Sequence, residues 1–468
     1  MEKKKGFQMP TTCALLFMLM VLAAVLTWII PAGEYEMEKV GDINRVVAGT
    51  YHIIERNPQG LWELFQAVPT GFRNVANMMF SIMFIGGAIS VLEKSGAFYA
   101  AFGKIAKKKL NSRVLAFVIM LFMTIGGATG VFVNSTIALV PIGITLALSL
   151  GFDSFSGFLM VYLGAYSGFN VGWAVHSTIG VAQPIAELPL FSGMNVRIVI
   201  HGINFIICYL FTIYYMEKVK RVPQTSLNYQ PGMEVGEYMG LKQDGMGMGE
   251  GQLTRQHIFS LLGLVIAIGI LLVGCVTAGW AQEQIAAIFF VLAVYLGLLN
   301  GMGINGTTKA FIDGCAKMVH AAFITGFANG ISVLMTNGRI LNTIVYWLSI
   351  PMSALGSVLG ANFMFFANLF INLFIPSGSG QAAAVMPIMV PVADLAGITR
   401  QVAVQAFQFG DGLTNSIFPT SGTLMASLAI TGVDWTRYAK WFVRVLLCQI
   451  VLACLSLTIL QMIGWTGL

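Results

Sequence analysis

Two short stretches of sequence decide the fold: Gly-Ala-Thr-Gly-Val-Phe-Val-Asn-Ser-Thr at residues 127–136 and Ile-Pro-Ser-Gly-Ser-Gly-Gln at residues 375–381. Each stretch is rich in small and hydroxyl residues and separates two apolar runs. The preceding runs, Val114–Ile125 and Phe363–Phe374, have twelve residues each, whereas a helix needs roughly twenty apolar residues to cross a bilayer. Each pair of short arms predicts a re-entrant hairpin with its polar tip at membrane depth, where non-helical backbone must line protein or a water-filled cavity.

The whole chain has the composition of a polytopic membrane protein. Of its 468 residues, 57% are hydrophobic and 10% are charged, and the mean hydropathy is +0.79. Soluble domains carry about 25% charged residues. The six cysteines stand singly, without a CxxC pair or a Cys/His cluster, so we expect no cofactor and no metal site beyond sodium. The expected partners are the lipid bilayer and a small-molecule substrate, and no nucleic acid.

The distribution of basic residues predicts how the chain is oriented. With both hairpins treated as non-crossing, the chain has nine crossings, with its N-terminus inside and its C-terminus outside. In that arrangement 19 of the 26 Lys and Arg residues lie on the inner side, as the positive-inside rule requires. We therefore expect a multi-pass protein of the cytoplasmic (inner) membrane. The seven outer residues are Lys39, Arg45, Arg56, Arg73, Arg197, Arg339 and Arg400.

The sequence contains an internal repeat. Ala-Ile-Ser-Val-Leu-Glu-Lys-Ser-Gly at residues 88–96 matches Gly-Ile-Ser-Val-Leu-Met-Thr-Asn-Gly at 330–338, an offset of 242 residues. The run Ser-Thr-Ile-Gly at 177–180 matches Pro-Thr-Ser-Gly at 419–422 with the same offset. The first matched helix is predicted to run from outside to inside and the second from inside to outside, so the repeats are inverted. Such symmetry is typical of transporters that work by alternating access.

The predicted fold class is an all-α polytopic membrane protein with two inverted-topology repeats, each containing a re-entrant hairpin and an interrupted helix. Interfacial helices are expected at Gly60–Asn74 and Thr307–Lys317, the latter leading into a separate crossing at Val319–Leu334. The expected organisation is a first transmembrane helix and external segment at 1–59, repeat 1 at 60–220 with hairpin 114–150, a cytoplasmic linker at 217–255, connecting helices at 256–304, and repeat 2 at 305–468 with hairpin 363–396.

Three motifs resemble one transporter family: Trp-Ile-Ile-Pro-Ala-Gly-Glu-Tyr (28–35), Gly-Gly-Ala-Ile-Ser-Val-Leu-Glu-Lys-Ser-Gly-Ala (86–97) and Pro-Ser-Gly-Ser-Gly-Gln (376–381). They are similar to the YfcC-type members of the four-carbon dicarboxylate anaerobic carrier (DcuC-like) family, within the ion transporter superfamily. The resemblance covers nearly the whole chain outside the linker. It implies two hairpins that meet near the bilayer centre, often a homodimer, and either basic amino acid exchange or dicarboxylate transport.

The polar breaks are the predicted substrate site. In sodium/dicarboxylate members of the superfamily, Ser-Asn-Thr motifs at hairpin tips hold the substrate carboxylate, and the resemblance carries this role over by position. Broken helices also expose unpaired N–H groups that attract carboxylates and C=O groups that attract cations. The expected substrate-binding residues are Asn134, Ser135, Thr136, Ser377, Gly378, Ser379, Gly380, Gln381, Asn415, Thr420 and Ser421.

Asp411 is the most informative candidate for coupling transport to an ion, because an acid within the membrane is usually functional. It lies in Gly-Asp-Gly-Leu-Thr-Asn-Ser-Ile-Phe-Pro-Thr-Ser-Gly (410–422), which predicts an unwound segment. We expect it to bind a coupling cation, relay a proton or pair with a substrate amine; the alternative is that it only caps the following half-helix. The full set of candidate ion-binding or coupling residues is Gly130, Asn170, His176, Ser177, Thr178, Asp411 and Thr414.

These features favour a secondary active transporter for a small charged organic solute. An amino acid is slightly favoured, by exchange or cation coupling, because Asp411 can receive an amine and no arginine lies well inside the hairpins. A four-carbon dicarboxylate is the alternative. A channel and an intramembrane enzyme are distant alternatives, since no Ser/His/Asp or metal-ligand spacing is present. No GxxxxGK[ST] motif indicates ATP hydrolysis, and the sequence leaves sodium, protons and exchange open as the driving force.

Overall fold

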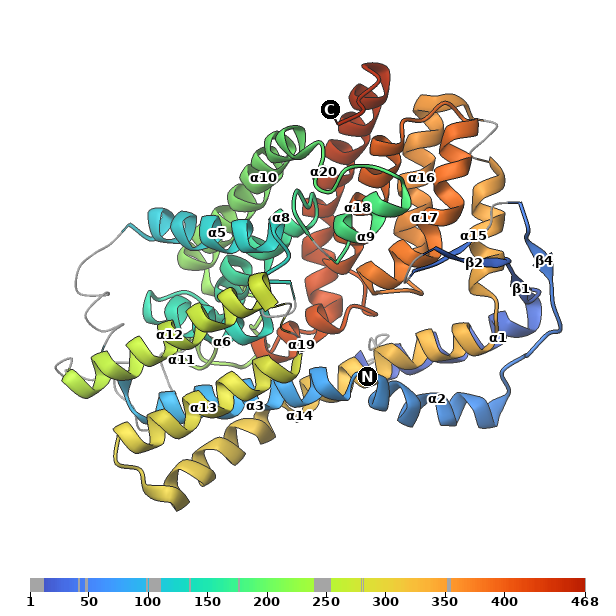
Figure 1. Ribbon diagram of the computed structural model, residues 1–468. Coiled ribbons are helices and arrows are strands. Elements are labelled where there is room, and N and C mark those ends of the chain that lie inside the picture. Colours follow the sequence, from blue (N-terminus) through green and yellow to red (C-terminus); the bar gives the residue numbers. More distant parts are fainter. Residues whose placement is uncertain are drawn as a thin grey trace, which may run out of the picture.

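The computed structural model describes residues 12–40, 43–46, 49–97, 100, 111–133, 136–175, 177–239, 254–278, 280, 282–351 and 355–467. The described chain is almost entirely helical (Figure 1). Within it, five helices are long and apolar enough to cross a membrane. They are α3 (Ala76–Lys94), α10 (Met194–Arg221), α13 (Gln282–Leu299), α14 (Gly303–Asn337) and α20 (Trp435–Met462).

Long helices form a layer along one side of the molecule, below the remaining helices in Figure 1. The helix α14 packs along α3, and its other neighbours include α1 (Thr12–Ile29) and α2 (Leu61–Asn74). Small residues allow this close approach: a β-carbon on Gly314 would lie 2.3 Å from the carbonyl oxygen of Gly86. The helix α13 packs on α3, and α12 (Arg255–Ala278) packs on α13.

The structure corrects the expected break between an interfacial helix at Thr307–Lys317 and a crossing at Val319–Leu334. These residues form the single helix α14, which is 35 residues long. No glycine or proline occurs between Cys315 and Thr325, so nothing in this stretch ends the helix. In the first half of the chain, by contrast, α2 and α3 are separate helices that meet at Val75.

Both predicted hairpins are pairs of helices joined by a short turn. The first consists of α5 (Ser112–Ala128) and α6 (Thr136–Ser149), and the second of α16 (Gly356–Asn372) and α17 (Gly378–Leu395). None of the four belongs to the helices long and apolar enough to span a membrane. They nevertheless exceed the predicted twelve-residue arms. In α5 the terminal glycines remain helical because they allow close packing: a β-carbon on Gly127 would lie 1.8 Å from the carbonyl oxygen of Ala165.

Each hairpin is followed in the sequence by an interrupted helix. The first is α7 (Ser154–Phe158), a π-helical turn (Leu159–Leu163) and α8 (Gly164–Phe169), followed after a non-helical segment by α9 (Ile179–Ile185). The second is α18 (Arg400–Asn415) followed by α19 (Gly422–Thr431). The short second halves are exchanged, because α9 packs on α17 and α19 packs on α6.

Helix bounds in the two halves recur with the 242-residue offset found in the sequence. The helix α6 begins at Thr136 and α17 begins at Gly378, 242 residues later. The helices α2 and α3 together correspond to α14. The pairs α5 and α16, α9 and α19, and α10 and α20 agree with the same offset within two residues at their first positions.

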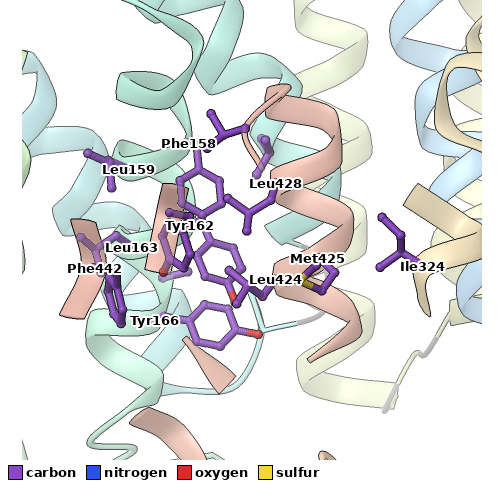
Figure 2. Close-up of a cluster of buried hydrophobic side chains, with 14 of the residues drawn as sticks. Phe158, Leu159, Tyr162, Leu163, Tyr166, Ile324, Leu424, Met425, Leu428 and Phe442 are labelled. Atoms are coloured by element: carbon purple, nitrogen blue, oxygen red, sulfur yellow. The ribbon is translucent and has the colours of Figure 1, made fainter. Parts of the chain in front are cut away.

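A column of aromatic side chains connects the two interrupted helices (Figure 2). Phe158, Tyr162 and Tyr166 recur every four residues, so they share one helix face. The ring centroids of Phe158 and Tyr162 are 4.8 Å apart, and those of Tyr162 and Tyr166 are 4.3 Å apart. Leu424 and Leu428 of α19 lie beside them. The column fixes the first interrupted helix against the second.

The remaining described elements are two strand pairs and a few short helices. Two antiparallel strand pairs occur in the segment expected outside the membrane, β1 (Gly33–Glu34) with β4 (His52–Ile53) and β2 (Met37–Val40) with β3 (Ile43–Val46). The helix α15 (Leu341–Ser349) leads towards the second hairpin. The described part of the linker contains a 3₁₀ turn at Pro223–Thr225 and the short helix α11 (Val235–Tyr238).

Candidate functional site

A polar cavity lies where the second hairpin, the second interrupted helix and α14 meet. Its volume is about 430 Å³. Most of its polar lining consists of hydroxyl and amide groups, and among the described residues no lysine, arginine, aspartate or glutamate lines it. The polar lining residues are Tyr166, Ser177, Thr325, Asn329, Ser332, Ser377, Ser379, Asn415, Thr420, Ser421 and Thr423. We call this space the central cavity.

Two helix N-termini open into the central cavity. The helix α17 begins after Ser377, whose hydroxyl accepts from the backbone N–H of Gly380 at 3.3 Å, and α19 begins after Ser421, whose hydroxyl accepts from that of Leu424 at 3.5 Å. Serine is a favoured N-cap, and Pro376 shortly before the first cap cannot extend a helix backwards. Each cap satisfies one of the four free N–H groups of its helix, and the others carry partial positive charge. Together they favour a carboxylate.

Asp411 lies directly behind the wall of this cavity. Its side chain is fully buried, and its Oδ1 accepts from Asn372 Nδ2 at 2.7 Å and from Asn415 Nδ2 at 3.3 Å. Its Oδ2 has no hydrogen-bond partner among the described residues. That oxygen lies 3.3 Å from the place a β-carbon on Gly378 would occupy. Because residue 378 is glycine, only main chain separates the carboxylate from the cavity at this point.

The structure corrects both expectations about the local setting of Asp411. The residue lies inside α18, which continues to Asn415, and not in an unwound segment. It does not cap the next half-helix either, because Ser421 does so. The neighbouring glycines permit close packing and do not break the helix: β-carbons on Gly410 and Gly412 would lie 2.4 Å from Asn368 Cβ and 2.5 Å from Asn170 Cα.

A network of amide side chains holds Asp411 in place. Asn372 Nδ2, which donates to Asp411, also lies 2.8 Å from Gln381 Oε1. Gln381 Nε2 in turn donates to Asn368 O at 3.0 Å and Oδ1 at 3.1 Å. Gln381 was expected to contact substrate, but it is fully buried in this network and does not line the cavity. Its role in the structure is to position Asn372.

Several buried oxygens near Asp411 lack a hydrogen-bond partner among the described residues. They are Asp411 Oδ2, Asn372 Oδ1 and Thr178 Oγ1. Thr178 lies beside Gly378, since a β-carbon on that glycine would be 2.4 Å from Thr178 Cγ2. Buried polar atoms without a partner are costly. These three are oxygen atoms, whereas Asn170, which packs against Gly412, has a nitrogen, Nδ2, that also lacks a partner among the described residues. An oxygen-rich group of this kind has the chemistry to hold a monovalent cation or a proton.

The two interrupted helices satisfy each other's terminal carbonyl groups. Gln408 Nε2 donates to Phe169 O at 2.7 Å, and Gln405 Nε2 donates to Val171 O at 3.2 Å. In the other direction, the hydroxyl of Tyr162 donates to Asn415 O at 3.0 Å. Tyr438 of α20, which belongs to neither interrupted helix, donates to Ser416 O at 2.5 Å. These carbonyls, which the sequence offered as cation ligands, therefore already have donors.

The other candidate residues fall into three groups. Ser177, Ser377, Gly378, Ser379, Asn415, Thr420 and Ser421 line the central cavity. Five do not line it: Gly130 forms a turn with φ +84°, Thr136 donates to Phe132 O, Thr414 donates to Gly410 O at 2.6 Å, Asn170 accepts from Ser416 Oγ at 3.3 Å, and Gly380 lies in the first turn of α17. Asn134, Ser135 and His176 lie outside the described residues.

The sequence analysis missed the contribution of α14. Thr325, Asn329 and Ser332 all line the central cavity. Their spacing of four and three residues places them on one helix face, and polar residues on one face of an apolar helix indicate a lined pathway. That signal was present in the sequence. Asn368 and Asn372, one turn apart on α16, are a second missed pair with the same kind of signal.

The apolar helices, the paired hairpins and the central cavity between them define a polytopic α-helical membrane protein. The model of the C4-dicarboxylate anaerobic carrier family, DcuC, matches residues 9–462. The chain therefore belongs to this family of membrane transporters.

Two relatives extend over nearly the same length. The chain is 29% identical to the putative basic amino acid antiporter YfcC of Escherichia coli strain K12, over 93% of each chain. It is 25% identical to an uncharacterized protein of Haemophilus influenzae Rd, over 98% of each chain.

Two solved structures resemble the chain with lower sequence identity. One is the Neisseria gonorrhoeae efflux pump MtrF, with 18% identity and a TM-score of 0.42, covering 98% of this chain and 96% of that one. The other is the Alcanivorax borkumensis transporter YdaH, with 15% identity and a TM-score of 0.42, covering 98% and 100%.

Proposed function

We propose that this protein is a secondary active transporter that moves a small charged organic solute, most readily an amino acid, across the cytoplasmic membrane by basic amino acid exchange or cation coupling. The observation that carries the proposal is the convergence of two capped helix N-termini on the central cavity with Asp411 directly behind its wall. This arrangement offers partial positive charge to a carboxylate and a negative charge nearby. An amino acid presents the complementary pair of groups.

The carboxylate end of the solute is assigned to the free N–H groups of α17 and α19. Ser377 and Ser421, the two caps, line the cavity together with Ser379 and Thr423. These groups are neutral, so the helix ends supply the electrostatic attraction. The amine end is assigned to the part of the cavity that Asn415 lines, because Asn415 Nδ2 donates to Asp411 Oδ1.

Asp411 is the proposed coupling group. With Asn372 Oδ1 and Thr178 Oγ1 it forms an oxygen cluster without hydrogen-bond partners among the described residues, suited to a sodium ion or to a proton on the carboxylate. Either occupant neutralises the buried charge, which is costly when left alone. Binding of the cation or proton at this cluster and binding of the solute in the cavity would then influence each other through the main chain at Gly378.

Two inverted repeats supply the proposed route to alternating access. The 242-residue offset in helix bounds and the exchange of α9 and α19 between the halves support this organisation. In such transporters, exchanging the conformations of the two halves converts an inward-open state into an outward-open one. The proposed orientation has the N-terminus inside and the C-terminus outside, and the protein functions as a carrier and not as an enzyme or channel.

The relatives support two substrate classes. The relative named as a putative basic amino acid antiporter favours an amino acid, whereas the family name favours a four-carbon dicarboxylate. The dicarboxylate remains the alternative, because two helix N-termini can bind two carboxylates without an arginine. The absence of any lysine or arginine from the described lining favours the amino acid.

Uptake into proteoliposomes tests the proposal. Purified protein is reconstituted and supplied with labelled arginine, ornithine or succinate, with and without sodium and pH gradients. We expect saturable uptake of an amino acid, accelerated by internal unlabelled amino acid or by a cation gradient. Uptake of succinate alone would replace the substrate assignment with the dicarboxylate. Flux that neither saturates nor shows counterflow would exclude a carrier.

A further inference from the structure

A second cavity lies at one end of the first hairpin, away from the central cavity. Its volume is about 250 Å³. The first residues of α5, the last turns of α10 and Phe152 form its walls. The start of α5 and the end of α10 therefore lie at the same level of the molecule.

This cavity carries an excess of positive charge, and we call it the basic cavity. Arg113, Lys220 and Arg221 line it, together with one acid, Glu217. Arg113 and Glu217 form an ion pair, which leaves the other two cations uncompensated. Within the described part of the chain neither Lys220 nor Arg221 forms a salt bridge. Lys220 Nζ lies 5.7 Å above the ring centroid of the buried Phe152, a cation–π contact.

Exposed apolar surface adjoins the basic cavity. On α5, Val114 and Val118 are 59% and 56% exposed; Val114 directly follows the lining residue Arg113, and Val118 lies about one turn further along the helix. On α10, Leu210 and Tyr214 are 59% and 61% exposed at similar distances along the helix. The helices α5 and α10 contact each other along this stretch, where Phe117 packs against Tyr209 with ring centroids 5.3 Å apart. A face of this composition in a membrane protein is covered by lipid acyl chains.

We propose that the basic cavity binds the headgroup of an anionic phospholipid, with its phosphodiester near Lys220 and Arg221 and its acyl chains on the exposed faces of α5 and α10. Basic pockets between transmembrane helices are suited to anionic headgroups, and guanidinium groups match phosphate oxygens in geometry. The adjoining apolar surface selects a lipid over free phosphate, which has no apolar part to place there.

The bound lipid would connect two parts of the proposed transport machinery. The helix α5 is the first arm of the first hairpin, and α10 leads into the linker. Apart from helix packing, the hydroxyl of Tyr209 joins them by donating to Arg113 O at 3.1 Å, and Arg113 pairs with Glu217. The lipid headgroup would bind α10 at Lys220 and Arg221 while its acyl chains lie across both α5 and α10, so lipid binding is expected to stabilise the folded protein.

The test uses the full chain purified in detergent, with bound lipid measured by native mass spectrometry during titration with phosphatidylglycerol or phosphatidylcholine. The variant Lys220→Gln/Arg221→Gln removes both uncompensated cations. The matched control, Lys218→Gln/Lys309→Gln, removes the same charge from exposed residues that do not line the cavity. A cation near an anionic lipid contributes about 5-fold in affinity, so the cavity variant should lose about 25-fold for phosphatidylglycerol.

Support requires that the wild type and the control prefer phosphatidylglycerol and that the cavity variant does not. Equal losses in the cavity variant and the control would overturn the site in favour of diffuse surface charge. If inorganic phosphate without added lipid stabilises the protein as much as the lipid does, the assignment of a lipid to this cavity is overturned. If the double variant does not fold, Arg221→Gln alone replaces it, because Arg221 is exposed. Its affinity for phosphatidylglycerol should fall about 5-fold.

Discussion

The two interrupted helices share their main-chain plan but differ in chemistry. The first is interrupted between α8 and α9 and the second between α18 and α19, and the carbonyl ends of each accept hydrogen bonds from the other. At the position that corresponds to Asp411 with the 242-residue offset, the first half has Phe169. Its N-cap residue Thr178 makes no side-chain cap, whereas Ser421 does. The comparison teaches that similar main-chain elements in the two halves carry different side chains, and among the described residues of the two interrupted helices only the second has a buried acid within its bounds.

The largest effect is expected from Asp411→Asn, which makes the second half as neutral as the first. Asparagine keeps the size of the side chain but removes the charge that the proposed cation or amine requires. Losing one partner of a buried charge pair costs about 2–5 kcal/mol, so transport should fall at least about 30-fold. The measurement is initial uptake rate in proteoliposomes at several sodium concentrations and pH values.

The control for this prediction is Asp313→Asn on α14. This acid is exposed and pairs with Lys94 at the surface, at 2.9 Å, and such pairs contribute little. Its uptake should match the wild type. Full activity of the Asp411 variant with unchanged ion dependence would remove the proposed asymmetry between the halves.

A smaller loss is expected from Gly378→Ala. The added β-carbon would lie 2.4 Å from Thr178 Cγ2 and 3.3 Å from Asp411 Oδ2, so it forces apart the two halves where they meet. Overpacking of this kind costs about 1–3 kcal/mol, and we expect uptake to fall about 10-fold.

Thr178→Ser should partly rescue this variant, because it deletes the methyl group that the new β-carbon strikes and keeps the hydroxyl. A matched substitution, Gly380→Ala, meets only the side chain of Ser377, at 3.2 Å or more, and Ile375 Cγ2 at 3.7 Å, and should have little effect. If the double variant is as impaired as Gly378→Ala, the contact between the halves is not the cause of the loss.

Ser421→Ala tests the cap that the first half lacks. Loss of an N-cap costs about 1 kcal/mol, and because this helix end opens into the central cavity we expect KM for uptake to rise about 5-fold. Thr399→Ala removes a similar cap, to Val402 N at 3.3 Å, at the far end of α18. It should lower stability by a similar amount and leave KM unchanged. Equal KM values in the two variants would mean that α19 does not face the substrate.

The smallest effect is expected from Tyr162→Phe, which removes the hydrogen bond from the first interrupted helix to Asn415 O. A single hydrogen bond of this kind contributes about 0.5–1.5 kcal/mol. Thermal unfolding in detergent should show a small decrease in stability, whereas Tyr214→Phe, at a position 61% exposed, should show none. A stability loss of the same size in both variants would argue against the interlocking of the two breaks.

The helix pairs at 112–149 and 356–395 were foreseen from the sequence because the signals that end and begin these helices are local. Short apolar runs, Pro376 and the serines that follow it set where α17 begins, and Ser421 sets where α19 begins. The local setting of Asp411 was predicted wrongly. From the sequence, the glycines beside the acid indicate a helix break. In the structure, Gly410 and Gly412 are needed because main chain from distant parts of the sequence packs closely against them. Contacts of this kind depend on the assembled fold, as does the burial of Gln381.

The site on α14 could have been predicted from the spacing of Thr325, Asn329 and Ser332, had those residues been compared as one helix face. The continuity of α14 was harder to predict, because its counterpart in the first half is divided at Val75. A repeat carries over the bounds of elements, but whether two helices merge into one depends on the residues at the junction.

The glycine at position 378 has one more consequence. With a single layer of peptide between Asp411 and the central cavity, the electric field of the carboxylate would reach a solute bound there as proposed, without direct contact between the two. A change in protonation or cation occupancy on one side of this thin partition therefore alters the energy of a charged solute on the other side. Ion and solute can be bound in separate compartments and still influence each other's affinity.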